Sequence, residues 1–503
     1  MTCPTAAPAG PVPGEPVSSY TVLGKPVLGI LALAVLAPFA FSGCATVSNE
    51  SITADVSGIV SARLEQTLNW NAGSPEDASV RMAVDKMLDG QLTIDEAVAI
   101  ALINNRDMRA TLERTGVARA DLIQAGLLEN PVFGFTVLDG NVGSIREYEL
   151  FQELLSLFTL SARKNLAGKA LEQARLEVAQ SALDLAAEVK QTYYGLLADK
   201  QSIQLYTQVL DATEAAAVLA SRQYRAGTMS LREKAMQQSF HSQAALDGAR
   251  AEAGFAVDRE KLNRLLGLWG SRTHWTLPER LPDVPDGLPS GEAFEQRAMN
   301  ERLSLAALRA EVENAYMAVD YGRQTRWLSV FGIQYRVVRE ADGAYLRGPK
   351  IEFSLPLFDR GQAHMARLEA ELSDAENRYA QLAIDIRSEV REAASQLNAA
   401  QDMLRHYRSA VLPLADQVVG ETLKFYNGML VGVYELLSAK QTQIQATRDY
   451  IGVWRDFWLA WTDLELAIGT HLPTQVATSG AMEDSPGSAD MPAEHSEHQH
   501  GDH

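Results

Sequence analysis

VFGIQYRVV, at residues 330–338, alternates between two kinds of side chain along its whole length. One face of an extended chain would carry its apolar side chains, Phe331, Ile333, Tyr335 and Val337. The other face would carry Gly332, Gln334 and Arg336. A period of two is typical of a β-strand. Nine residues is also about the length that a tilted strand needs to cross a bilayer. We therefore predict a strand with one apolar face.

Further segments alternate in the same way. Their apolar positions are Ile351, Phe353, Leu355 and Leu357 in the second half, and Phe133, Phe135, Val137, Tyr148 and Leu150 in the first. The positions between them include Lys350, Glu352, Ser354, Pro356, Glu147, Glu149 and Glu153. Turn-forming residues separate each pair of segments, Asp139-Gly140-Asn141 in one and Asp342-Gly343 in the other. The pattern predicts two β-hairpins, at about 131–155 and 329–357.

The two halves of the chain resemble each other at a spacing of about 200 residues. The matching phrases are Val132-Phe133-Gly134-Phe135 with Val330-Phe331-Gly332-Ile333, Ser156-Leu157-Phe158 with Pro356-Leu357-Phe358, Tyr224-Arg225-Ala226-Gly227 with Phe425-Tyr426-Asn427-Gly428, and Leu265-Leu266-Gly267 with Ala467-Ile468-Gly469. Self-similarity at a fixed spacing indicates one repeated architecture. We predict that each half contains a helix, a hairpin, a long helix, a glycine turn and a return helix.

Helical signals fill the rest of each half. Thr93 followed by Glu96 is a capping box, from which we expect one helix to about Leu128. Apolar steps of three and four predict long helices over 162–225 and 362–426, each about 90 Å long. Pro413 should kink the second. Gly227 and Gly428 would supply left-handed caps before return helices at 231–266 and 433–468. A short helix is expected around Val56–Leu68.

The predicted organisation has six parts. They are a signal peptide at 1–43, a lead-in at 44–90, a first repeat at 91–269, a Pro- and Gly-rich linker or irregular collar at 270–291, a second repeat at 292–470 and a disordered tail at 471–503.

The N-terminus has the features of a bacterial lipoprotein leader. Lys25 precedes an apolar run, Val27 to Phe41, that is too short for a comfortable membrane span. The run ends in Phe41-Ser42-Gly43-Cys44, which resembles a lipobox although Phe41 replaces the usual Leu. We expect cleavage before Cys44 and lipid attached to it. Ala45 at the next position resembles lipoproteins sent to the outer membrane. An ordinary signal peptide with an incidental cysteine is the alternative.

Four strands are too few for a closed barrel, because about eight is the smallest closed size. An open sheet edge is not tolerated in lipid. The strands would therefore be completed by other copies of the chain, and three copies give twelve strands. The alternative is two soluble hairpins packed on helices.

The net charge of −19 argues against a general nucleic-acid surface.

The chain resembles the TolC family of outer-membrane efflux channels over residues 91–470. The phrases that carry the resemblance are Leu92-Thr93-Ile94-Asp95-Glu96-Ala97 through Asn104-Asn105, Gly126-Leu127-Leu128-Glu129-Asn130-Pro131, Leu355-Pro356-Leu357-Phe358-Asp359-Arg360-Gly361-Gln362, and Arg264-Leu265-Leu266-Gly267. The resemblance implies a mainly α fold with a membrane β-barrel. It implies a homotrimer whose twelve-stranded barrel in the outer membrane continues as an α-helical barrel into the periplasm.

The same resemblance implies partners and sites. The helix turns would lie at the periplasmic mouth and dock on a membrane-fusion adaptor that connects to an inner-membrane transporter. The docking residues would be Tyr224, Arg225, Gly227 and Ser230 at the first tip, and Tyr426, Asn427 and Gly428 at the second. Val431-Gly432 replaces Ser230-Leu231 at the second tip. Plain helix caps without a partner are the alternative.

No catalytic motif, phosphate loop or cofactor signature is present in the sequence, so we expect no enzyme activity. The tail does contain a candidate metal site, whose residues are His495, His498, His500 and His503. Imidazoles mixed with carboxylates suit Zn²⁺, Cu²⁺ or Ni²⁺. Their spacing is irregular, so any binding would be weak, and an incidental polar tail is the alternative.

The leading functional hypothesis is a passive exit duct of a tripartite efflux pump, with heavy-metal cations as a candidate substrate. Drug or small-molecule export and polypeptide export by a type I system are alternatives. A lipid-anchored periplasmic coiled-coil scaffold is the alternative from another class. A scaffold would have no reason to keep one strand face apolar.

Overall fold

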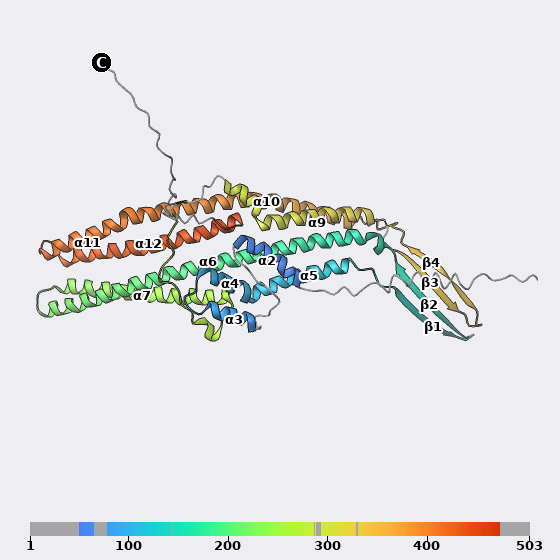
Figure 1. Cartoon of the computed structure of the whole chain (residues 1–503), viewed down its shortest axis with the longest axis horizontal. Helices are drawn as coiled ribbons and strands as arrows, with labels where there is room; N and C mark the ends of the chain where they lie inside the picture. Colours follow the sequence, from blue (N-terminus) through green and yellow to red (C-terminus); the bar gives the residue numbers. More distant parts are fainter. Residues whose placement is uncertain are drawn as a thin grey trace, which may run out of the picture. The chain divides into compact units, whose positions relative to one another are not determined.

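The computed structural model describes residues 50–64, 78–141, 143–285, 287, 293–327 and 330–472. The predicted signal peptide, Cys44 and the candidate metal ligands His495, His498, His500 and His503 lie outside the described residues. Figure 1 shows the chain as long helices and one small sheet. No helix among the described residues combines the length and the apolar character needed to cross a membrane.

The sheet has four antiparallel strands in the order β1-β2-β3-β4. Their bounds are Val132–Gly140 for β1, Gly143–Glu153 for β2, Phe331–Arg339 for β3 and Tyr345–Phe353 for β4. All four lie in the segments where apolar and polar residues alternate. β2 pairs with β3, so the two hairpins form one sheet, and Leu150 lies opposite both Phe133 and Tyr335. β1 and β4 are the edge strands.

The prediction of one helix from Thr93 to Leu128 is wrong. The capping box at Thr93 is present, but α4 ends at Asn104 (Ile94–Asn104) and α5 begins at Arg106 (Arg106–Ala125). Asn105 between them is extended, and its Oδ1 accepts a hydrogen bond from the Met108 N–H at 3.0 Å, which caps α5. The Asn105 side chain also donates to the Leu265 carbonyl at 2.9 Å. A contact 160 residues away therefore stabilises the break.

Gly267 ends α7 (Leu231–Leu266) in the left-handed conformation, with φ 66°. Asn104 donates from its side-chain amide to the Gly267 carbonyl at 2.9 Å, so the two segments touch. A Cβ at Gly267 would lie 2.7 Å from the Asn104 carbonyl oxygen. Only glycine allows both the left-handed conformation and the close approach of Asn104 at this position.

Gly267→Ala is therefore expected to destabilise the protein by about 2 kcal/mol or more, because it adds a left-handed alanine and a clash with backbone. Gly452→Ala is the matched control, since Gly452 lies within a helix and nothing is within 4 Å of the added atom. The control should be neutral or stabilising by up to about 1 kcal/mol. Urea unfolding of both variants measures the difference, and equal midpoints would contradict the expectation.

α6 is the longest helix and runs from Leu155 to Arg225, 71 residues. It begins seven residues before the predicted 162. Glu153 accounts for the earlier start, because its carboxylate accepts the N–H groups of Leu155 at 2.6 Å and Ser156 at 2.7 Å. A carboxylate at this end also suits the helix dipole. α6 packs against α5, α7, α9 and α12, so it is the central helix of the described chain.

The second half contains α8 (Phe294–Glu301) and α9 (Leu303–Thr325) before the second hairpin. The long helix that follows is interrupted. α10 (Gln362–His406) passes into one π-helical turn, Tyr407–Val411, and then into α11 (Leu412–Asn427), with Pro413 in its first turn. Proline lacks the N–H that a continuous helix would need here, and the wider turn accommodates it. α12 spans Val433–Ile468 and packs on α6, α10 and α11.

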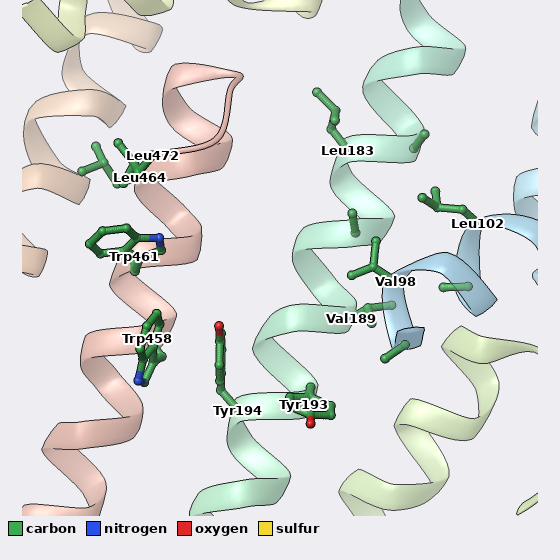
Figure 2. Close-up of a cluster of buried hydrophobic side chains, with 14 of the residues drawn as sticks. Val98, Leu102, Leu183, Val189, Tyr193, Tyr194, Trp458, Trp461, Leu464 and Leu472 are labelled. Atoms are coloured by element: carbon green, nitrogen blue, oxygen red, sulfur yellow. The ribbon is translucent and has the colours of Figure 1, made fainter. Parts of the chain in front are cut away.

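The main core lies where α6 meets α4 and α12 (Figure 2). Tyr194 of α6 stacks on Trp458 of α12 with ring centroids 5.1 Å apart. Val98 and Leu102 of α4 lie on the other side of α6, near Leu183. Small α6 residues such as Ala182 are fully buried, which lets neighbouring helices approach closely.

The segment 270–291 is more ordered than a linker over its described residues. Trp275 is 2% exposed, and its indole N–H donates to Asn263 at 2.8 Å. Arg259 lies over the Trp275 ring at 4.6 Å. The Pro282 carbonyl accepts hydrogen bonds from the indoles of Trp454 and Trp458, both at 3.0 Å. This segment therefore ties α7 to α12. The expected short helix 56–68 is α2 (Glu50–Leu64), and α3 spans Ala78–Met87.

Candidate functional site

The sheet exposes its apolar face. Directly paired residues share a face, so the register gathers the apolar positions of all four strands on one side. Phe133 is 66% exposed and Ile351 67% exposed. The remaining exposed members are Phe135, Val137, Tyr148, Leu150, Ile333, Tyr335 and Phe353. We call this set the apolar face. Such a contiguous exposed patch marks an interaction or membrane surface.

The opposite face of the sheet carries paired polar side chains at its centre, with Leu138 and Leu346 among the apolar residues nearer the hairpin turns. Arg336 forms an ion pair with Glu147, and Gln334 donates a hydrogen bond to Glu149. Glu147 is 9% exposed and Gln334 5% exposed, so these two polar side chains are covered while Phe133 and Ile351 of the apolar face are open. In a water-soluble protein, a sheet of this kind would bury its apolar face and expose its polar face. The distribution fits a sheet with lipid on one side and a polar interior on the other.

The first helical tip is the turn that joins the C-terminus of α6 to the N-terminus of α7. Gly227 has φ 75°, and its N–H donates to the Tyr224 carbonyl at 3.0 Å. Ser230 caps α7 through a capping box with Glu233. Hydrogen bonds from the Ser230 side chain, and then from its backbone, hold the pKa of Glu233 below its usual value. Lys234 lies 4.9 Å from the centre of the Tyr224 ring.

Ser230, Arg225 and Gly227 are exposed, as a docking surface requires. The glycine has nothing within 4 Å of an added Cβ, so its backbone is open to close approach. The first tip therefore combines a rigid turn, an accessible backbone and fixed donors.

The second helical tip joins α11 to α12 and differs from the prediction. Gly428 has φ −78°, so it is not the left-handed residue. Met429 takes that conformation with φ 54°, alone among the described residues other than glycine. When Gly428 is matched with Gly227, α11 ends one residue later than α6, because α11 continues to Asn427. The left-handed conformation therefore falls on the residue after Gly428. A left-handed methionine costs about 1 kcal/mol or more.

The second tip presents an exposed apolar cluster, which we call the second-tip cluster: Phe425, Met429, Leu430 and Tyr434. Met429 is 93% exposed and Leu430 72% exposed. The residues predicted from the sequence at this tip are Tyr426, Asn427 and Gly428, and the second-tip cluster was not predicted. The run Met429-Leu430-Val431 beside a glycine turn was the signal that could have revealed it. The two tips thus differ: the first exposes Arg225 and Ser230 beside Leu231, and the second exposes the apolar second-tip cluster.

A buried ionic cluster fixes the end of α12. The Glu465 carboxylate is 2.8 Å from Lys190 Nζ and 2.6 Å from His471 Nδ1. The Trp461 indole N–H and the Leu472 N–H also donate to it. Burial raises the pKa of Glu465, but the hydrogen bond with His471 and the charge of Lys190 outweigh burial and lower it to about 2. The cluster joins α12 to α6 and to the residues after α12.

No group of three or more His, Cys, Asp or Glu residues that could hold a metal ion occurs in the part of the chain that the structure describes. The candidate metal ligands of the tail and the candidate lipidation residue Cys44 lie outside it.

Known proteins resemble the chain in sequence and in fold. No family model matches the chain. The chain is 25% identical over 386 residues to the cobalt-zinc-cadmium resistance protein CzcC of Cupriavidus metallidurans, covering 76% of this chain and 90% of CzcC.

Two solved outer-membrane proteins share the fold. VceC, an outer membrane protein of Vibrio cholerae, matches with a TM-score of 0.64 at 15% identity, covering 75% of this chain and 96% of VceC. The CmeC outer membrane channel of Campylobacter jejuni matches with a TM-score of 0.63 at 12% identity, covering 83% and 92%. The chain therefore shares the fold of these outer-membrane proteins and is similar in sequence to CzcC.

Proposed function

We propose that three copies of the chain complete a twelve-stranded barrel in the outer membrane. The observation that carries the proposal is the sheet with an exposed apolar face and two unpaired edge strands, β1 and β4. Each edge would lack hydrogen-bond partners in lipid, which is costly for every unpaired amide. Pairing of β1 from one copy with β4 of the next removes both edges. The polar face with Glu147 and Arg336 would then line the interior.

The long helices would continue the barrel as a periplasmic tunnel. The 71 residues of α6 correspond to about 106 Å at the rise of an α-helix. A length of this order suits a conduit that crosses a compartment. The unboiled protein should migrate as a trimer on a gel and as a monomer after heating. Migration as a monomer without heating would count against the barrel.

The two tips are proposed as the docking surface for a membrane-fusion adaptor, which would link the duct to an inner-membrane transporter. The first tip supplies Tyr224, Arg225, Gly227 and Ser230. The second supplies Tyr426, Asn427 and Gly428 together with the second-tip cluster. Apolar side chains exposed at a helix turn are a liability in water unless a partner covers them. The strained backbone at Met429 fits a functional position.

Met429→Asp should weaken binding of the purified adaptor by about 2 kcal/mol, roughly 30-fold, while trimer formation stays unchanged. A charge would replace an apolar contact at the centre of the second-tip cluster. Met82→Asp is the matched control, because Met82 is an exposed methionine on α3, 66% exposed and outside both tips. Surface-immobilised adaptor titrated with each trimer measures the affinity. Equal affinity for the two variants would remove the second tip from the docking surface.

Heavy-metal cations are the proposed substrate. The support is the likeness to a protein whose name records resistance to cobalt, zinc and cadmium, together with the four tail histidines. Loss of the chain should raise cellular cobalt, zinc or cadmium and lower tolerance to these metals. A rise in retained drugs or in unsecreted polypeptide, with metal tolerance unchanged, would favour the alternative export substrates.

Deletion of residues 474–503 should leave trimer formation intact, because the predicted strands and helices all lie before it. If His495, His498, His500 and His503 capture exported cations, the deletion should lower metal tolerance. Growth on graded zinc concentrations measures this effect. Unchanged tolerance would show that the tail has no part in export.

We also propose that lipid on Cys44 anchors the mature chain at the outer membrane. The alternative of a lipid-anchored periplasmic scaffold is disfavoured by the apolar face. A scaffold in water would bury Phe133 and Ile351 against its own helices, yet both are more than 60% exposed.

A further inference from the structure

Three arginines lie on the apolar face of the sheet, at the end where the hairpins turn. Arg146 of β2 pairs directly with Arg339 of β3, and Arg347 of β4 pairs with Val337, two residues before Arg339. Paired residues share a face, so all three point to the same side as the apolar residues. All three are exposed. We call them the arginine cluster.

Among the described residues, no ion pair neutralises the arginine cluster. Like charges directly opposite each other in a sheet are destabilising. No carboxylate of the described residues forms an ion pair with Arg146, Arg339 or Arg347. The carboxylates Glu147 and Glu149 lie on the opposite face, where they pair with Arg336.

One acidic residue shares the face of the arginine cluster. Asp139 pairs with Ser144, one row nearer to the hairpin turn than Arg146 and Arg339. The face therefore carries three positive charges and one negative charge near its edge. This excess of positive charge is not compensated within the described chain.

The surroundings of the arginine cluster are those of a membrane boundary. Tyr345 lies beneath Arg339, whose guanidinium carbon is 5.6 Å from the ring centre. Phe135 and Tyr148 are paired in the same row as Val337 and Arg347. On the side of this row away from the hairpin turns, the face is apolar apart from Gln152. Tyrosine and arginine next to an apolar band are typical of the zone where lipid headgroups meet hydrocarbon.

We propose that the arginine cluster binds phosphate groups on the headgroup of a lipid in the leaflet that the hairpin turns reach. The inference rests on the proposed function, because it requires the apolar face to meet lipid. The planar guanidinium matches the oxygens of a phosphate in two parallel hydrogen bonds. The apolar side chains below would contact the acyl chains of the same lipid. A lipid headgroup therefore fits the surface better than free phosphate, which would leave the apolar residues uncovered.

The test uses the full mature trimer in mixed detergent micelles, titrated with a glycolipid that carries two phosphates. The same glycolipid without its phosphates is the second probe, and inorganic phosphate is the third. The variants are Arg347→Gln alone and the triple substitution R146Q/R339Q/R347Q. Lys350→Gln is the matched control, because Lys350 is a cation of the same strand on the opposite face. Trimer migration on a gel is recorded for each variant.

The phosphorylated glycolipid should bind more tightly than its dephosphorylated form. Affinity should fall about fivefold in the single variant and roughly 100-fold in the triple variant. Lys350→Gln should leave it unchanged. Inorganic phosphate should not displace the lipid at equal concentration.

Equal binding of the two glycolipids by an intact trimer would overturn this inference and leave the proposed channel standing. Displacement by inorganic phosphate at equal concentration would also overturn it, in favour of simple ion binding. A wild-type chain that forms no trimer in lipid would overturn both proposals.

Discussion

Phe133→Lys is expected to prevent stable assembly of the trimer in the outer membrane. Phe133 lies on the edge strand β1, about midway along the length of the apolar face, and pairs with Leu150, which in turn pairs with Tyr335. A lysine facing lipid near the bilayer midplane costs about 2–4 kcal/mol. Three copies would bring the cost to roughly 6–12 kcal/mol per trimer, which is comparable with the whole stability of many proteins. Outer-membrane fractionation and unheated gels measure the loss.

Thr136→Lys is the matched control for this experiment. Thr136 lies on the same strand, but its pairing with Glu147 places it on the polar face. The same lysine should be tolerated there, because it would face the water-filled interior of the proposed barrel. If Phe133→Lys assembled as well as Thr136→Lys, the apolar face would not meet lipid.

Glu465→Ala is expected to lower the free energy of unfolding by about 3 kcal/mol, because it leaves the partly buried Lys190 without its counter-charge. Four groups contact this carboxylate: Lys190, His471, the Trp461 indole and the Leu472 N–H. Asp463→Asn is the control on the same helix. Its amide oxygen can still accept the hydrogen bond from Gln191, so the change should stay within about 0.5 kcal/mol.

The contribution of Glu465 should also depend on pH. Its folded pKa is lowered to about 2 from a usual 4.5, so the folded state favours the charged form. The stabilisation is fully present above pH 4.5 and is lost as the pH falls towards 2. Urea midpoints of the wild type and Glu465→Gln should therefore differ at pH 7 and converge near pH 2. A difference that persisted near pH 2 would exclude the carboxylate charge as its source.

The strands and the start of α4 could be predicted because their signals are local. Alternation around Tyr335 indicates which side of the strand meets an apolar environment, whether that environment is a protein core or lipid. The capping box at Thr93 uses two residues three positions apart. Gly227 could be identified because few other residues adopt its backbone conformation.

Other features depend on contacts that single-sequence patterns do not contain. Asn105 breaks a helix because its side chain reaches Leu265, 160 residues away. The left-handed residue of the second tip is Met429, because α11 extends by one residue. The sequence pattern around Glu465 is that of an ordinary residue on a helix surface. Its ion pair with Lys190, on a distant segment, makes it part of a buried cluster. Pairing of β2 with β3 likewise requires both halves of the chain.

The most direct measurement is a structure of the mature protein in lipid nanodiscs. We expect three copies, with β1 of one copy hydrogen-bonded to β4 of the next and with Phe133, Leu150 and Ile351 facing lipid. A monomer whose hairpins fold back to cover these side chains with its own helices would contradict the account.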